Sequence, residues 1–356
     1  MAFLRRKKAL IGLDIGSHSA KILQLKQTRN EFIVQKVGMA QYPSGSFDGH
    51  HIADIKAVAK TISKLWQNLN LEGKKVVLSV PGNEIMTEMP RIPLMKRSAV
   101  FSYVDDKIKD FITYSPDEVF YGVDILEENK EGTLTILIAY ARRGIVYDYE
   151  KLMSIAGLYP VILDVDYFAL FNAFEATEGL PADEVIALVD IGASKSISVI
   201  IENKFPAFTK SFLMGTNELI FQLMDKFTLS YQDAYGFITG TVDPDVIAYP
   251  EDEVRALLLF FIDQMVSEMK NIMDYFSSLE GKKVKRVFLS GGLARSPGIA
   301  LQIEKSLGIP VFIFNPLASE KVKVESDVDP DYVRAIGPQM AICFGLALRQ
   351  EEGKGK

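Results

Sequence analysis

Two short stretches, far apart in the chain, share one design. "LIGLDIGSHSAK" at residues 10–21 and "LVDIGASKSISVII" at 188–201 both run from an apolar segment through Asp-Ile-Gly into a turn of small residues, and then back into an apolar segment. Alternating β-branched residues predict strands on both sides of each turn, and glycine supplies the backbone freedom that a tight hairpin needs. A repeated hairpin predicts a duplicated architecture, with one such turn in each half.

The predicted elements repeat in the same order around these hairpins. A β-meander, a helix, a strand and a helix occur twice, which favours an α/β fold of two halves with a cleft between them. "YPSGSFDGHH" at 42–51 has the composition of a loop. The main strands are predicted at Ala9–Ile15, Ala20–Lys26, Phe32–Gln41 and 185–212, and the main helices at Asp54–Leu69, 217–227, 230–238 and 252–279, with a last helix in "GPQMAICFGLALR" at 337–349.

The first half is interrupted by a separate α+β unit at about 84–150. Its strands and amphipathic helices predict an inserted α+β subdomain. The elements expected in it are strands near Ile85–Met89, Val119–Leu126 and Thr133–Ala141, and helices near Ser98–Ile112 and Ile145–Ala156.

Composition excludes several classes of function. The chain has 40 basic and 46 acidic residues, so it offers no basic footprint for nucleic acid. The single cysteine, Cys343, cannot form an internal disulfide, which fits a reducing cytoplasm. No apolar window approaches the roughly 20 residues of a membrane span, so a soluble protein is predicted. The basic cluster Phe3–Lys8 could touch an anionic membrane weakly, but a solvated tail is the favoured interpretation.

The first hairpin turn has the residue types of a phosphate site. Backbone N–H groups around Gly16 can converge on an anion, and Ser17 and Ser19 add hydroxyl donors. Lys21 faces the interior side of its strand, where a buried ammonium needs an anionic partner. Asp14 would repel a phosphate unless a cation lies between them, and Mg²⁺ held by one or two carboxylates through waters resolves that conflict.

The second and third glycine-marked turns extend the same interpretation. Asp190, Gly192 and Ser194 repeat the first design, so two hairpins could clamp a polyphosphate from opposite sides. Gly291-Gly292 lies between a strand and a helix, where a flat group such as adenine could approach the backbone closely. The competing interpretation is structural, with the aspartates capping their own turns and Lys21 extending its head to the surface.

The motifs together resemble the actin-like ATPase superfamily, and within it the PilM family of type IV pilus assembly proteins. The stretches that carry this resemblance are "LIGLDIGSHSAKILQL", "LYPVILDVDYFAL", "ALVDIGASKSISVI", "VFLSGGLARSPGIALQIEKSLGIPV" and "AIGPQMAICFGLALR". It implies a duplicated actin-like fold, two lobes around a nucleotide cleft, with an α+β insert of the kind that FtsA and PilM carry. The implied subdomains are 1A at 1–83 and 152–181, 1C at 84–151, 2A at 182–229 and 283–335, and 2B at 230–282, with 336–356 as the C-terminal helix of 1A and tail.

The resemblance also implies ATP with Mg²⁺ in the cleft and slow hydrolysis at most. Asp166 and Asp190 would be the catalytic acids, the former orienting the attacking water, although Asp166 could equally be a helix N-terminal carboxylate. Asp14 and Asp190 would hold Mg²⁺ through waters. The implied nucleotide-binding residues are Asp14, Gly16, Ser17, Ser19, Lys21, Gly192, Ala193, Ser194, Gly215, Thr216, Glu218, Gly291, Gly292, Leu293, Arg295 and Gly337.

The implied partner is the N-terminal cytoplasmic segment of the inner-membrane protein PilN, held in a groove that involves the 84–150 region. Such a protein would be cytoplasmic, peripheral at the inner membrane through its partner, indirectly linked to the pilus motor ATPases and open to self-association. Three other functions stay open: an FtsA-like membrane-associated filament former, a small-molecule kinase of the same superfamily, and an adaptor that binds no nucleotide.

Overall fold

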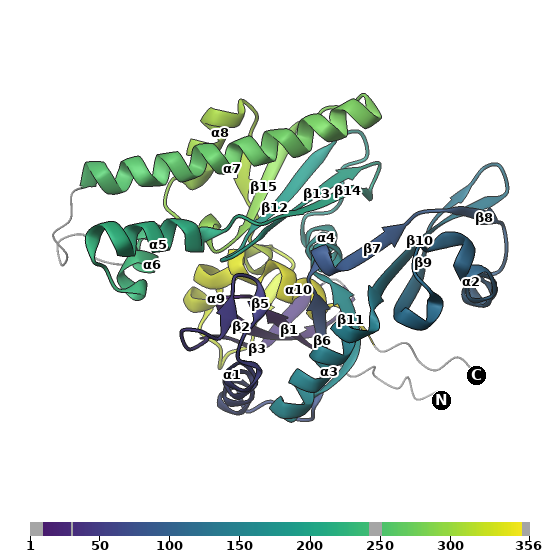
Figure 1. Ribbon diagram of the computed structural model, residues 1–356, viewed down its shortest axis with the longest axis horizontal. Helices are drawn as coiled ribbons and strands as arrows, with labels where there is room; N and C mark the ends of the chain where they lie inside the picture. The colour runs from purple at the N-terminus through teal and green to yellow at the C-terminus, as the bar shows by residue number, and fades with distance from the viewer. Residues whose placement is uncertain (1–9, 30, 242–250, 351–356) are drawn as a thin grey trace.

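The structure, a computed structural model, describes residues 10–29, 31–241 and 251–350, and forms two lobes with a smaller unit at one side (Figure 1). The basic cluster Phe3–Lys8 and the tail beyond Gln350 lie outside the described residues. No helix in the described ranges is long and apolar enough to cross a membrane.

The first lobe is built on a six-stranded sheet in the order β11-β6-β1-β2-β3-β17. The meander β1–β2–β3 is antiparallel, and β6 and β11 add to it in parallel. The strands are β1 (Ile11–Ile15), β2 (Ser19–Gln27), β3 (Phe32–Gln41), β6 (Lys75–Val80), β11 (Tyr159–Val165) and β17 (Val322–Val324).

The second lobe repeats this topology in a five-stranded sheet, β14-β13-β12-β15-β16. Its meander is again antiparallel, and its last two strands again add in parallel. β12 and β13 therefore correspond to β1 and β2, which confirms the predicted duplication. The strands are β12 (Ile186–Ile191), β13 (Ser196–Glu202), β14 (Phe205–Phe212), β15 (Arg286–Gly291) and β16 (Val311–Ile313).

Two helices lie between the sheets and join the lobes. α4 (Asp166–Thr177) and α10 (Ala341–Ala347) share one buried cluster with residues of both sheets. They approach so closely that a Cβ at Gly345 would lie 1.8 Å from the carbonyl oxygen of Ala169, so this contact needs glycine. The last helix, predicted at 337–349, begins later than expected. Gly337–Met340 form a 3₁₀ turn that follows α9 (Pro330–Ile336), and the α-helix α10 starts at Ala341.

The outer faces of the two sheets are covered by different sets of helices. α1 (Ile55–Asn68) and α3 (Arg143–Ala156) pack on the first sheet, where Leu152 and Met153 join the core of α1. The second sheet is covered by α5 (Thr216–Phe227), α6 (Tyr231–Thr239), α7 (Glu251–Glu280) and α8 (Ile299–Leu307). Buried apolar residues at helical spacing explain these contacts.

The smaller unit has its own sheet and its own core. Strands β7, β10 and β8 lie side by side, and β9 pairs with β10. Its core extends from Ile92 to Tyr140, whereas α3 packs on the first lobe. The last strand of the insert sheet ends at Arg142, one residue beyond the end expected from the sequence. Its elements are β7 (Ile85–Glu88), β8 (Arg91–Pro93), α2 (Arg97–Phe111), β9 (Val119–Asn129) and β10 (Thr133–Arg142).

The loop predicted at 42–51 contains a short hairpin, which corrects that expectation. β4 (Phe47–Asp48) pairs with β5 (His51–Ile52), and Gly49 takes the positive φ that the two-residue turn requires. Strands of two residues are too short to show alternation, so the turn residues alone were visible in the sequence.

Candidate functional site

The first hairpin brings Asp14 and Lys21 face to face. They are paired across β1 and β2, and the Lys21 ammonium donates to Asp14 Oδ2 at 2.7 Å. Burial lowers the pKa of Lys21, but the ion pair with Asp14 and the charge of Asp190 outweigh it, so the net pKa is raised. Lys21 is therefore a permanent cation at the mouth of the hairpin.

The second hairpin places Asp190 opposite, at the end of β12. The Ser290 hydroxyl on β15 donates to Asp190 Oδ2 at 2.7 Å. Burial raises the pKa of Asp190 to about 6, although Ser290 and the charge of Lys21 favour the ionised form. A buried carboxyl group whose pKa is raised toward neutral pH is typical of functional sites.

The second turn is fastened to the start of α5. The backbone N–H groups of Thr216 and Asn217 donate to the carbonyl oxygens of Gly192 and Ala193, at 3.0 and 2.8 Å. Gly215 allows this approach, because a Cβ there would lie 2.3 Å from the Ala193 oxygen. Gly215 thus lets α5 pack against the turn. The N–H groups of Thr216 and Asn217 already donate within the protein, so they are not free to bind a phosphate.

Asp166, the first residue of α4, joins three parts of the chain. Its Oδ1 accepts from the backbone N–H groups of Gly82 and Tyr167, at 3.0 and 2.8 Å, and its Oδ2 accepts from the Lys195 ammonium at 2.6 Å. Asp166 is therefore placed for either predicted role. It occupies the N-terminus of α4, and it also lines the cleft. Lys195 belongs to the second turn but was not predicted as a site residue.

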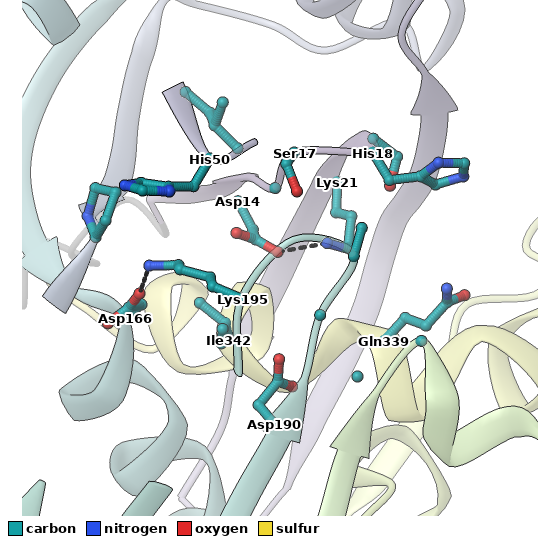
Figure 2. Close-up of a pocket in the computed structure, with 18 of the residues that line it drawn as sticks. Asp14, Ser17, His18, Lys21, His50, Asp166, Asp190, Lys195, Gln339 and Ile342 are labelled. Atoms are coloured by element: carbon teal, nitrogen blue, oxygen red, sulfur yellow. Dashed lines mark hydrogen bonds and ion pairs between the residues drawn. The ribbon is translucent and has the colours of Figure 1, made fainter. Parts of the chain in front are cut away.

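One pocket at the junction of the lobes collects these groups (Figure 2). Asp14 and Lys21 lie on one side of it, Asp190 on the other, and the Asp166–Lys195 pair at one end. The predicted residues that line it are Asp14, Gly16, Ser17, Ser19, Lys21, Asp166, Asp190, Gly192, Ala193, Thr216, Gly291 and Gly292.

Other predicted residues lie outside this lining. Glu218 faces a different cavity, beside Gln264 and Glu268, and Leu293 is fully buried in the core of the second lobe. Arg295 reaches the pocket only through Gln339, whose Oε1 accepts from Arg295 Nη1 at 3.2 Å. Three more predicted residues are also absent from the lining, namely Ser194, Gly215 and Gly337.

An aromatic cluster across the cleft was missed in the sequence. His18, in the first turn, stacks on Tyr231 and Tyr235 of α6, with ring centroids 5.4 and 5.0 Å apart. The Tyr231 hydroxyl contacts His18 Nδ1 and donates to Asn217 Oδ1, both at 2.9 Å. Burial, and then the charge of Lys21, lowers the pKa of His18 to about 4, so its ring is neutral at neutral pH. The only signal in the sequence was the i, i+4 spacing of the two tyrosines.

Two equivalent sheets that share a pair of helices, with an Asp-Ile-Gly hairpin of each sheet at one central pocket, define the actin-like ATPase fold. The sequence profile described as "Type IV pilus assembly protein PilM" matches residues 12–351. The chain therefore belongs to this family, as the motifs predicted.

The chain is also similar to individual proteins. The structure of a PilM-PilN type IV pilus biogenesis complex superposes with a TM-score of 0.78 at 22% identity, over 96% of this chain and 98% of that chain. The ethanolamine utilization protein EutJ from Carboxydothermus hydrogenoformans superposes at 0.54 with 15% identity, over 95% of this chain and 89% of that chain. The cell division protein FtsA of Streptococcus pneumoniae is 21% identical, over 88% of this chain and 77% of its own length.

Proposed function

We propose that this protein is an ATP-loaded adaptor of type IV pilus assembly, which binds Mg²⁺-ATP in the interlobe pocket and a PilN-type segment beside the insert. The main observation in favour of nucleotide binding is that the two equivalent hairpins bring Lys21, Asp14 and Asp190 to one pocket. Gly291 and Gly292 line the same pocket, where adenosine would lie.

The charged groups around the pocket favour Mg²⁺ as a companion of the bound ATP. Lys21 and Lys195 are each held by a carboxylate, Asp14 and Asp166. A triphosphate would draw both ammonium groups away and leave its own charges facing Asp14 and Asp190. Mg²⁺, bound by one or two carboxylates and by phosphate oxygens, offsets that repulsion. Asp166 would then be free to orient a water for slow hydrolysis.

One set of contacts favours a second candidate, an adaptor that binds no nucleotide. Both lysines already have anionic partners, and His18 occupies part of the cleft, where its ring stacks against Tyr231 and Tyr235. A pocket satisfied by its own residues can persist without a ligand. The two candidates differ in whether millimolar ATP binds to the purified protein.

The surface between the insert and α3 supports the partner half of the proposal. Phe120 of β9 and Tyr147 of α3 make an edge-to-face contact at 5.7 Å, yet they are 40% and 51% exposed. Arg143 lies over the Phe120 ring at 4.8 Å. Exposed aromatic rings beside a cation are typical of protein docking surfaces, and this pair lies where the insert meets the first lobe. Through such a partner the protein would sit at the inner membrane.

Removing the insert is expected to abolish binding of a PilN N-terminal peptide and to leave ATP binding intact. Ile85 pairs with Ala141 at the base of the insert, so residues 86–140 can be replaced by a short Gly-Ser linker. A deletion that continued to 150 would also remove Arg143–Glu150 of α3, including Tyr149, which packs against the first-lobe core. Fluorescence anisotropy with a labelled peptide measures the loss.

A double substitution tests the same surface without deleting the insert. Phe120→Ala/Tyr147→Ala should weaken peptide binding by about tenfold or more, since buried aromatic anchors carry much of the energy of an interface. Phe260→Ala is the matched control, because Phe260 is 55% exposed on α7 of the other lobe. Peptide affinity that survives both the deletion and the double substitution would move the partner site elsewhere.

A further inference from the structure

Two of the three histidines of this chain lie side by side at the edge of the cleft. His50 is in the two-residue turn between β4 and β5, and His51 is the first residue of β5. Neighbouring residues of a strand point to opposite faces. Here the turn brings the two imidazoles to the same side, with ring centroids 3.9 Å apart and planes tilted by 40°.

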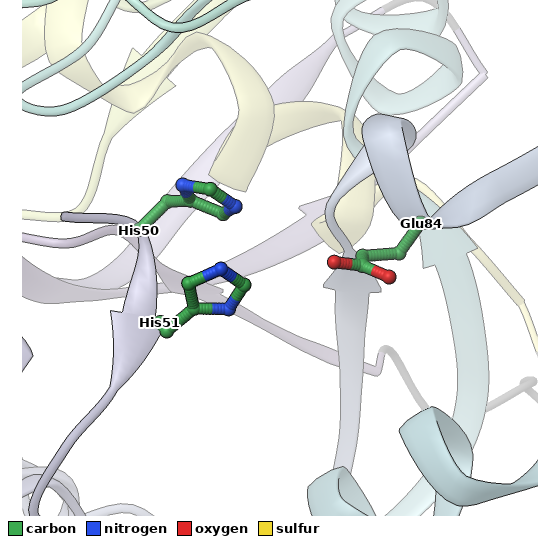
Figure 3. Close-up of side chains that lie close together, drawn as sticks. All are labelled: His50, His51 and Glu84. Atoms are coloured by element: carbon green, nitrogen blue, oxygen red, sulfur yellow. The ribbon is translucent and has the colours of Figure 1, made fainter. Parts of the chain in front are cut away.

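A carboxylate faces this histidine pair from another element. Glu84 belongs to the 3₁₀ turn Gly82–Glu84, which leads directly into β7 and the insert. Figure 3 shows its carboxylate pointing toward the two rings across a short gap. One ligand atom from each of His50, His51 and Glu84 can be chosen so that all three lie within 4.8 Å of one another.

The three side chains are available to a ligand. In the part of the chain that the structure describes, neither the His51 ring nor the Glu84 carboxylate is hydrogen-bonded or ion-paired. His50 makes one long polar contact, 3.4 Å between its Nε2 and Asn83 Nδ2, in the described part of the chain. His51 is exposed and the other two are half-buried, so an ion can enter from solvent. The nearby Lys195 ammonium is neutralised by Asp166.

We propose that His50, His51 and Glu84 form a binding site for one divalent ion of the zinc class. Two imidazole nitrogens and one carboxylate oxygen are a common ligand set for Zn²⁺, with water in the fourth position. Mg²⁺ and Ca²⁺ prefer oxygen ligands alone, so they are poor occupants. In a tetrahedral site with bonds of about 2.0–2.2 Å, ligand atoms lie about 3.4 Å apart, and the Glu84 side chain closes the remaining distance by rotation about its own bonds.

An ion at this position would join two parts of the first lobe. The β4–β5 hairpin covers the pocket, because Phe47 and His50 both line it. Glu84 lies at the root of the insert, two residues after Gly82, whose N–H donates to Asp166. The metal would therefore fix the hairpin to the segment from which the insert extends. This inference stands on its own residues and holds whether or not ATP binds.

The test is a titration of the metal-free, full-length protein with Zn²⁺, without nucleotide, against a chromophoric chelator. One Zn²⁺ per chain is expected, and Co²⁺ should give the visible absorption of a nitrogen- and oxygen-ligated site. His51→Ala and Glu84→Gln should each weaken Zn²⁺ by about 100-fold or more, because even outer-shell partners of a metal contribute 10- to 100-fold.

Glu72→Gln is the matched control, an exposed carboxylate of the same lobe outside the cluster. It should bind Zn²⁺ as the unmodified chain does. Thermal melting without metal shows whether the variants fold. Equal Zn²⁺ affinity in Glu84→Gln and the unmodified chain would overturn the proposal, since it would reduce the site to surface histidines. A chain that binds less than one equivalent at about 100 µM Zn²⁺ would overturn it too, because such an affinity is far weaker than that of a structural zinc site.

Discussion

Lys21→Ala is expected to abolish Mg²⁺-ATP binding and to lower the free energy of unfolding by about 3 kcal/mol or more. The lysine and its partner Asp14 are mostly buried, with side chains 13% and 10% exposed. Removal of one member of such a pair leaves an uncompensated charge, which costs about 3–5 kcal/mol. Here Asp190 adds a second carboxylate to the same region. Denaturant unfolding and ATP calorimetry measure the two losses separately.

A double variant separates the two effects. Asp14→Asn/Lys21→Met removes both charges and keeps similar volumes, so most of the stability should return. ATP binding should stay absent, because the phosphate-binding ammonium is still missing. An alanine variant at position 21 that keeps full ATP affinity would show that the first hairpin does not bind the phosphates.

Asp190→Asn is expected to stabilise the protein at about pH 8 by about 3 kcal/mol, a shift of roughly two pKa units at 1.36 kcal/mol each. The pKa of Asp190 is raised from 3.8 to about 6, chiefly by burial. Above about pH 6 the folded protein therefore holds a charge that the unfolded chain carries more easily. Below about pH 4 the carboxyl is protonated in both states, so the penalty disappears. The gain of the Asp190→Asn variant should shrink accordingly as the pH falls.

Urea unfolding of both proteins between about pH 4 and pH 8 checks this dependence. Asp225→Asn serves as the control, since Asp225 is exposed on α5 and should show no such trend. The Asp190→Asn protein should also lose the magnesium-dependent part of ATP binding, in keeping with the usual conflict between stability and function at active sites. A stability difference that is absent at pH 8, or that grows as the pH falls, would contradict the buried-carboxylate account.

Local sequence patterns predicted the fold and the polar core of the site. The two Asp-Ile-Gly turns identified equivalent hairpins, and strand alternation put Lys21 on the interior side of its strand, beside the turn that Asp14 faces. The direct pairing of Asp14 with Lys21 was found only in the structure. The predicted features depend on neighbours within a few residues, where the period of a strand and the chemistry of a turn act directly.

Contacts between distant segments escaped prediction because no local pattern encodes them. The ion pair of Lys195 with Asp166 and the stacking of His18 on Tyr231 each join separate elements, the latter 213 residues apart. Glu218 is a case in which the motif order and the structure point to different places. Its place in the motif order suggested the nucleotide, but on α5 it lines another cavity.

The proposed metal site combines a local feature, the adjacent His50 and His51, with a contact between separate elements. His50 and His51 are adjacent in the sequence, yet they were assigned to a loop, because a hairpin of two-residue strands has no periodicity to detect. Glu84 joins them only through the packing of the first lobe. A pair of histidines in an otherwise histidine-poor chain was the available signal.

The central claim is that the two hairpins form one Mg²⁺-dependent nucleotide site, and isothermal calorimetry of the purified protein with ATP tests it most directly. With Mg²⁺ present, binding should saturate at about one ATP per chain. With EDTA in place of Mg²⁺ the affinity should fall by about tenfold or more, a difference of about 1.4 kcal/mol, because Asp14 and Asp190 would then face the phosphates without a cation. No binding at millimolar ATP, or equal affinity with and without Mg²⁺, would contradict the account.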